Sequence, residues 1–228
     1  MTPSEGTIQF AYDLRPPSSP VINAEQLASL NGWREMFRRL GLLGQEQQRY
    51  EGLGFGNLSL RCVSGESPFV ISASQTSGDA LATATDMVRV TGCNLQRFWV
   101  DAEGSQPPSS ETLTHGMIYS ADPRIDWVFH CHSPDLWGQA TELGLPCTPQ
   151  DVGYGTPAMV TAVAELLATQ HSRPLVFATL GHTDGIFACG QTARDTGGLL
   201  LVYLARALTQ NFAQAAELVR DSSRSVST

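Results

Sequence analysis

The 228-residue chain contains no lysine, and all 14 of its basic residues are arginine. This absence excludes a Schiff-base lysine, a lysine-bound pyridoxal cofactor and the lysine of a phosphate-binding P-loop. Any carbonyl chemistry must therefore use another electrophile. Asp and Glu number 22, which gives a formal net charge of -8. We therefore expect no nucleic-acid partner, because an extended basic surface is missing.

The sequence also has few marks of secretion or membrane insertion. Its five cysteines are scattered and form no CxxC pair, as is typical of reduced thiols in a cytoplasmic protein. Residues 1–20 contain neither the basic nor the apolar region of a signal peptide. The longest apolar stretch, 198–208, is interrupted by Arg206 and is too short to span a bilayer. These features predict a cytoplasmic protein with no membrane partner.

The length and composition predict one domain with terminal extensions. Hydrophobic residues make up 42% and charged residues 16% of the chain, which is typical of a globular protein with a well-formed core. Residues 1–21 end in a turn-rich Pro and Ser segment and are predicted to form an N-terminal arm outside the core. The domain is expected over 22–219, followed by a disordered tail over 220–228.

Helical and strand-like segments are interleaved along the domain. Asn23 is a predicted N-cap, Ser109 or Ser110 is another, and Pro157 is expected to begin a helix. The predicted helices cover 24–40, about 110–121, 133–144, 156–170 and about 192–218. The predicted strands cover 55–61, 68–72, 87–93, 95–100, 127–132, 174–180 and 185–190. This order favours an α/β fold, a single-domain α/β/α sandwich around a central mixed, largely antiparallel sheet.

Two histidines occur two residues apart in the apolar strand WVFHCH. Side chains alternate between the faces of a strand, so His130 and His132 point to one face and Cys131 to the other. Two imidazoles placed in this way can bind one metal ion. For the HxH pattern alone, two buried histidines bonded to the backbone are an equal alternative.

A carboxylate and a third histidine extend the pattern. Taken alone, Glu111 is an acid near a helix start, where the helix dipole favours it, and His182 is a turn histidine in GHTDG. Taken with His130 and His132, they make a site of three imidazoles and one carboxylate. Three protein nitrogens with an exchangeable fourth position are typical of a catalytic rather than a structural zinc.

Several segments together resemble the class II aldolase/adducin family, whose members include L-fuculose-phosphate aldolase. They are FGNLSLR (55–61), SSETLTHGMIY (109–119), VFHCHSP (128–134), GYGTPAM (153–159) and LGHTDGIFACG (180–190). The resemblance covers roughly residues 24–218. It implies a homotetramer with active sites between subunits, and a divalent metal, with Zn²⁺ as the first choice.

The resemblance also implies a role for each site residue. His130, His132 and His182 would be the metal ligands, and Glu111 would be the acid/base and an additional ligand in the absence of substrate. His115 would be a neighbouring or packing residue rather than a ligand. Gly56, Asn57, Ser109 and Ser110 match positions that hold a substrate phosphate in the family. Thr76, Ser77 and Gly78 are further predicted substrate-binding residues, which can supply the contacts of the family's second phosphate loop.

The loop ASQTSGDA (73–80) departs from the family's Thr-Pro-(Ser/Thr)-Gly pattern, and an ordinary Ser/Gly turn is an equal alternative for it. Whether the substrate is phosphorylated therefore stays open. Tyr119 and Tyr154 are each a proton donor or a core aromatic residue.

Carbon–carbon cleavage next to a carbonyl passes through an enediolate, and in a chain without lysine a divalent cation is the available electrophile. We therefore predict a metal-dependent lyase that performs aldol and retro-aldol chemistry on a hydroxy-carbonyl, sugar-derived substrate through a metal-stabilised enediolate. A dehydratase or an epimerase on the same site is the main alternative. A non-catalytic adducin-like scaffold is a weaker alternative, since members of that type lack the metal histidines and all three are present here.

Overall fold

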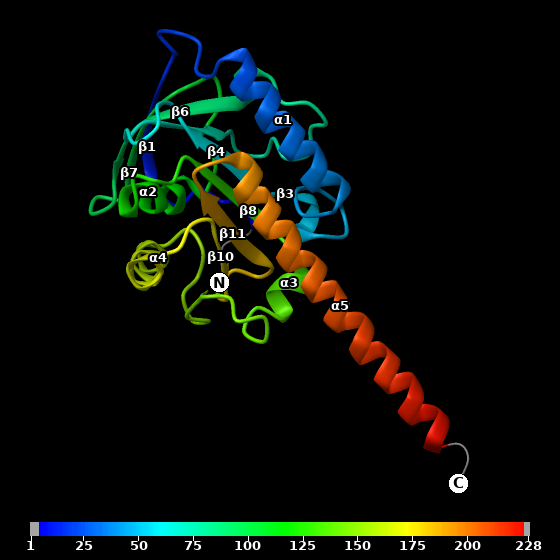
Figure 1. The fold of residues 1–228 in the computed structure, drawn as a ribbon. Helices are drawn as coiled ribbons and strands as arrows, with labels where there is room; N and C mark the ends of the chain where they lie inside the picture. Colours follow the sequence, from blue (N-terminus) through cyan, green and yellow to red (C-terminus); the bar gives the residue numbers. More distant parts are fainter. Residues whose placement is uncertain (1–4, 226–228) are drawn as a thin grey trace.

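The computed structural model describes residues 5–225, and beyond residue 217 it describes the backbone alone. Its centre is a nine-stranded sheet in the order β1-β7-β6-β5-β4-β8-β11-β10-β9 (Figure 1). The strands are β1 (Ala11–Arg15), β4 (Asn57–Arg61), β5 (Phe69–Ser72), β6 (Met87–Asn94), β7 (Trp99–Glu103), β8 (Trp127–His132), β9 (Cys147–Thr148), β10 (Leu175–Thr179) and β11 (Gly185–Gly190). The two outermost pairs, β1 with β7 and β10 with β9, are parallel, and the other six are antiparallel. The predicted mixed, largely antiparallel sheet is confirmed.

Helices cover both faces of this sheet (Figure 1). They are α1 (Ala24–Arg39), α2 (Thr112–Ala121), α3 (Pro134–Gly138), α4 (Pro157–Thr169) and α5 (Ala193–Ser225), with short 3-10 turns at η1 (Tyr50–Gly52) and η2 (Ala84–Asp86). On one face α2 and α4 pack against residues such as Phe177, while α1, α3 and α5 pack on the other face against residues such as Phe129. A further two-stranded sheet pairs β2 (Gly44–Gln45) with β3 (Gly54–Phe55). The α/β/α sandwich is therefore the observed fold.

Capping residues fix where the helices begin. The side chain of Asn23 accepts a hydrogen bond of 2.8 Å from the Gln26 N–H and caps α1, as predicted. Pro157 is the first residue of α4. Helix α2 differs from the prediction: its N-cap is Glu111 rather than Ser109 or Ser110, and Glu111 makes no capping bond with its side chain. The Glu111 carboxylate is thereby left available for other contacts.

The described part of the N-terminal arm joins the sheet, which corrects the prediction that the arm lies outside the core; residues 1–4 of the predicted arm lie outside the described residues. Strand β1 pairs in parallel with β7, and Phe10 is buried in the core on the α2 and α4 face. Its pairing was not visible in the sequence, because an edge strand is half-exposed and its partner lies nearly 90 residues away.

The hairpin between β6 and β7 is placed differently from the prediction of a strand over 95–100. Asn94 accepts a hydrogen bond of 2.9 Å from the Arg97 N–H through its side chain, and Phe98 has a positive φ of 54°. These features make residues 95–98 a turn, and β7 begins only at Trp99. The strand β9 is two residues long and was not predicted.

Helix α5 runs along the body and then projects from it (Figure 1). Near its start, Gly197 packs against the indole of Trp33 on α1, where an added Cβ would lie 2.2 Å from the ring. The helix continues through Ser225, so residues 220–225 of the predicted disordered tail are helical, and 226–228 lie outside the described residues. Within the described chain, we find no helix with the combined length and apolar character that bilayer crossing requires.

Candidate metal centre and active site

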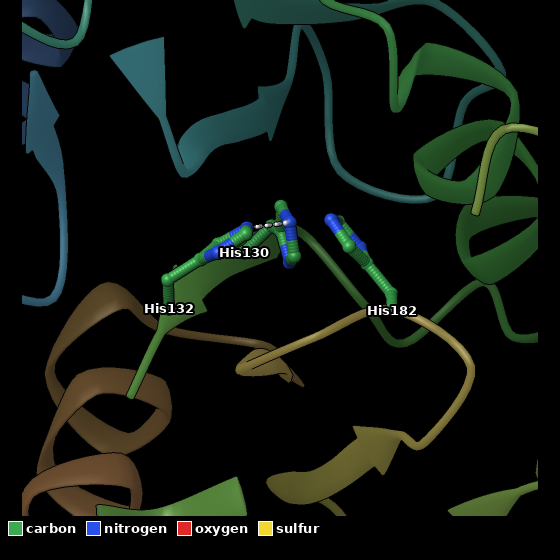
Figure 2. A group of neighbouring side chains, drawn as sticks. All are labelled: His130, His132 and His182. Atoms are coloured by element: carbon green, nitrogen blue, oxygen red, sulfur yellow. Dashed lines mark hydrogen bonds between the residues drawn. The ribbon is translucent and has the colours of Figure 1, made fainter. Parts of the chain in front are cut away.

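Three histidine rings converge on one point at the end of β8 (Figure 2). His130 and His132 project from the same face of β8, and His182 comes from the turn between β10 and β11. Because β11 pairs antiparallel with β8, with Gly185 opposite His132, this turn lies next to the end of β8. The Nε2 atoms of His130 and His132 are 3.2 Å apart, and the candidate ligand nitrogens of all three rings lie within 4.8 Å of one another.

The two rings on β8 are buried and neutral, as metal ligands must be, and the ring of His130 is also oriented by a hydrogen bond. His130 Nδ1 lies 3.2 Å from the Ile186 carbonyl oxygen, which only an N–H can bond, so its Nε2 carries the lone pair. Burial is the main cause that lowers the pKa values of His130 and His132 well below the usual range, and the neighbouring His182 adds to it. If the two Nε2 atoms share a hydrogen bond, the proton lies on His132 Nε2, and Nδ1 of His132 is left buried without a partner. In the other tautomer both Nε2 atoms carry lone pairs, and one cation would satisfy both. The donor set therefore fits a divalent metal.

Glu111 lies against the third ring of the cluster. Its Oε2 accepts a 2.7 Å hydrogen bond from the Thr114 hydroxyl, and its buried Oε1 has no hydrogen-bond partner but is 3.5 Å from His182 Nδ1. Burial raises the pKa of Glu111, although the charge of His182 and the Thr114 bond oppose this shift. The pKa of His182 is also raised. Burial alone would lower this pKa, but the hydrogen bond to Glu5 and the negative charges of Glu5 and Glu111 outweigh the effect of burial.

A small polar pocket contains most of the predicted substrate-binding positions. It is lined by Gly56, Asn57, Ser77, Ser109 and Ser110, together with residues of the arm and of the loop after β5. Gly56 has a φ of +74°, and a Cβ there would lie 3.0 Å from the His130 carbonyl oxygen. Glycine therefore allows this loop to approach the metal-binding strand closely.

Two predicted substrate-binding residues do not line this pocket. The Thr76 hydroxyl donates to the Ala73 carbonyl, inside the loop, and Gly78 packs against the Gln45 side chain. The Thr76 carbonyl in turn accepts a 2.6 Å hydrogen bond from the fully buried Arg34 of α1. Arg34 was not predicted to take part, because one arginine on an otherwise apolar helix face carries no recognisable signal.

A second residue that the sequence did not reveal is Glu5. Its Oε2 lies 2.8 Å from His182 Nε2, and its Oε1 lies 3.7 Å from His132 Nε2. An isolated acid in a terminal arm has no motif around it, and only the three-dimensional path of residues 5–10 brings it here. The histidine cluster thus has carboxylates on two sides, Glu5 at Nε2 and Glu111 at Nδ1 of His182.

The remaining candidate residues fall into two environments. His115 lies outside the three-histidine cluster, with its Nδ1 2.7 Å from the Ser59 hydroxyl, and burial lowers its pKa to about 3. Tyr119 bonds to the same Ser59 hydroxyl and is a core residue. Tyr154, by contrast, stacks on His182 with a ring-centre distance of 4.5 Å.

A comparison against known families identifies the family of the chain. A sequence profile of the class II aldolase and adducin N-terminal domain matches residues 42–210. The chain belongs to this family, and the matched region contains the three histidines, Glu111 and all the predicted substrate-binding positions.

Solved structures of this fold are similar to the chain over most of its length. L-fuculose-1-phosphate aldolase from Thermus thermophilus superposes with a TM-score of 0.61 at 18% identity, covering 86% of this chain and 98% of the other. A sugar-phosphate aldolase from Thermotoga maritima gives 0.64 at 12% identity, covering 84% and 96%. YgbL from Escherichia coli, whose name leaves open whether it is an aldolase, an epimerase or a decarboxylase, gives 0.60 at 18%, covering 81% and 87%. At these identities the likeness establishes a common fold.

Proposed function

We propose that the protein is a metal-dependent lyase that carries out aldol and retro-aldol chemistry on a hydroxy-carbonyl compound, of the size of a sugar derivative. The observation that carries this proposal is the convergence of three buried imidazoles, two of them with facing Nε2 atoms 3.2 Å apart, beside a buried carboxylate. His130, His132 and His182 would hold a divalent cation, and Zn²⁺ is our first choice for a nitrogen donor set.

In a retro-aldol step, the bond between the α-carbon and the carbon bearing the β-hydroxyl breaks. The electron pair moves to the carbonyl fragment, the hydroxyl proton leaves to a base, and an aldehyde forms. A divalent cation held by the three imidazoles would polarise the substrate carbonyl and its neighbouring hydroxyl oxygen. No lysine is available for the Schiff-base route to the same end.

Glu111 supports the proton transfers of this scheme. Its Oε1 is buried without a hydrogen bond and has a raised pKa, mainly because of burial. A carboxyl in such a position can hold or release a proton near neutral pH more readily than an exposed one. We therefore assign it the acid/base role.

The polar pocket supports recognition of the substrate's far end. The hydroxyls of Ser77, Ser109 and Ser110 and the amide of Asn57 are uncharged groups that can bind a phosphate or a hydroxyl group. Among the described residues, no lysine or arginine lines this pocket. A phosphorylated substrate and an unphosphorylated one are therefore both candidates.

A dehydratase or an epimerase would use the same ligands and the same carboxylate, because both reactions begin with a polarised carbonyl. An adducin-like scaffold is less well supported, since the three ligand residues are present and adjacent.

The family resemblance further suggests a homotetramer. In the described part of α5, the Phe212 side chain is 76% exposed, as expected for a helix that packs against a partner subunit. Light scattering would test this point, and a fully active monomer would contradict a site shared between subunits.

The proposed reaction can be tested on purified protein. Metal content is measured by mass spectrometry before and after reconstitution with Zn²⁺, Mn²⁺ or Co²⁺. The loaded enzyme is then offered paired phosphorylated and unphosphorylated hydroxy-carbonyl compounds, with aldehyde release, water loss and epimer formation followed separately. Aldehyde release supports the lyase, and either of the other products alone would replace it. A protein that retains no metal after reconstitution would remove the basis of the proposal.

A further inference from the structure

The carboxylate of Glu5 lies beside the nitrogen atoms that would bind the proposed cation. Its two oxygens approach the Nε2 atoms of His182 and His132, at 2.8 Å and 3.7 Å. The Nε2 of His132 in turn faces that of His130. The side chain of Glu5 is only 11% exposed. Carboxylate oxygen is a common zinc ligand beside imidazole nitrogens, and its charge partly compensates that of the cation.

The arm that carries Glu5 is fitted against the site on two sides. Gly6 has a φ of +71° and packs so closely on the Gln75 side chain that an added Cβ would lie 2.2 Å from it. On the other side, the Thr7 N–H donates to the Tyr154 hydroxyl at 3.3 Å, and the Gln9 side chain donates to the Tyr154 carbonyl at 2.9 Å. Tyr154 also stacks on His182, so the same residue contacts both the arm and a candidate metal ligand.

With the arm in this position, the polar pocket has almost no free space. Glu5 and Gly6 form part of its lining, together with Ser109 and Ser110, and the space in which the centre of a water molecule can lie is about 10 Å³. This is roughly the room that a single water molecule requires. A hydroxy-carbonyl compound of several carbons is larger than this space, and movement of the Glu5 segment would enlarge it.

From these contacts we propose that Glu5 is a fourth protein ligand of the cation and that its segment is a displaceable cap, which a substrate must replace. The proposal rests on the metal site of the proposed function. Carbonyl and hydroxyl oxygens of a substrate would take over the coordination position of the Glu5 carboxylate. The arm would then act as an internal competitor of the substrate.

The experiment uses the full chain, freed of metal with a chelator, and two probes. Co²⁺ affinity is measured by calorimetry and by the visible absorption of the bound ion. The affinity of the Co²⁺-loaded protein for acetohydroxamate, a small bidentate oxygen ligand, is measured in the same way. The variants are Glu5→Gln, which removes the charge, and Tyr154→Phe, which removes the hydroxyl contact to Thr7. Glu165→Gln, an exposed acid on α4, is the control.

The proposal predicts changes of opposite sign for Glu5→Gln: Co²⁺ binds about tenfold or more weakly, whereas acetohydroxamate binds about fivefold or more tightly, because no cap competes with it. Tyr154→Phe should change both affinities in the same directions as Glu5→Gln but by less, because the arm is loosened while the Glu5 carboxylate remains. The control should resemble the wild type in both.

Three results would overturn the proposal. Unchanged affinities in Glu5→Gln would show that Glu5 neither binds the cation nor caps the pocket. Weaker binding of both probes would show a merely structural role for the arm, and the thermal unfolding midpoint of each variant would identify a damaged fold. A wild-type protein that binds no Co²⁺ would overturn the proposed function together with this inference, whereas metal binding that is independent of Glu5 would overturn this inference alone.

Discussion

The Oε1 atom of Glu111 lies 3.5 Å from Nδ1 of His182, while Nε2 of the same ring lies 2.8 Å from Glu5. The contact between Glu111 and His182 is electrostatic, since Oε1 makes no hydrogen bond, and it favours a proton on Nδ1, which leaves Nε2 as the nitrogen that can bind a metal. Glu111 can therefore orient a ligand and exchange a proton with substrate from the same position. The first prediction separates these two roles.

Replacing Glu111 by Gln should reduce kcat by about 10²-fold or more, because the amide cannot accept or release the proton. The amide can still contact His182, so metal content should stay close to that of the wild type. Turnover and bound metal are measured on the same preparations. Thr114→Val, which removes only the hydroxyl that bonds Glu111, is the matched control and should have a much smaller effect. Normal turnover in Glu111→Gln would withdraw the acid/base role.

Replacing His130, His132 or His182 by Ala should each reduce bound metal strongly, because a site with two protein nitrogens is weak. The exposed His171 provides the control, and His171→Ala should retain the full metal content. Metal per chain is measured after dialysis against a weak chelator. Lowering the pH should release metal from the wild type, since protons compete for the ligand nitrogens. Retention of metal in all three variants would show that the cluster is not the binding site.

Replacing Ser110 by Ala tests the polar pocket. If the physiological substrate is phosphorylated, KM should rise because a hydroxyl that can bond the phosphate is lost, and kcat should change less. The comparison is made with a phosphorylated substrate and its unphosphorylated counterpart. An equal and small effect on both substrates would show that Ser110 does not bind a phosphate group of the substrate.

Two adjacent glycines of α5 should behave in opposite ways. A Cβ at Gly197 would lie 2.2 Å from the Trp33 ring, so Gly197→Ala should cost about 1–3 kcal/mol through overpacking between α1 and α5. Gly198 has no heavy atom within 4 Å of the same position, so Gly198→Ala should be neutral or stabilising by up to about 1 kcal/mol. Urea unfolding measures both. Equal effects would contradict the observed packing of these two helices.

Asp122 should make stability depend on acid pH. Hydrogen bonds from Arg124 are the main cause that lowers its pKa, with help from Arg173. The ionised carboxylate therefore stabilises the fold above its ordinary pKa near 3.8, and this contribution is lost as the pH falls through the lower pKa of the folded state. Asp122→Asn should cost about 1–2 kcal/mol at pH 7 and less at pH 3. The exposed Asp151→Asn is the control, and an equal cost at both pH values would contradict the prediction.

Much of the fold could be predicted because its elements carry local signals. Asn23 caps α1, Pro157 begins α4, and apolar runs separated by turn residues mark the central strands. Strand β1 could not be predicted, since its stabilising partner β7 is distant in sequence and its own residues are half-exposed. Pairing of this kind is decided by tertiary context.

The candidate site divides in the same way. His130 and His132 were recognisable because strand geometry puts alternate residues on one face. Glu111 and His182 were weak signals alone and became candidates in combination with them, and the family resemblance then implied their roles. Glu5 has no such signal, because its position depends on the path of the arm across the pocket. The loop residue Thr76 was recognisable as polar, but the direction of its side chain depends on local hydrogen bonds.

The pairing of β1 with the sheet edge limits how far Glu5 can move. The first residue of β1 that pairs with β7 is Ala11, six positions after Glu5. A fully extended chain of six residues is about 20 Å long. A carboxylate on so short a tether stays at an effective concentration in the millimolar range or above. Diluting the protein therefore does not weaken this internal ligand, and any small molecule that enters the pocket must outcompete a carboxylate that is always nearby.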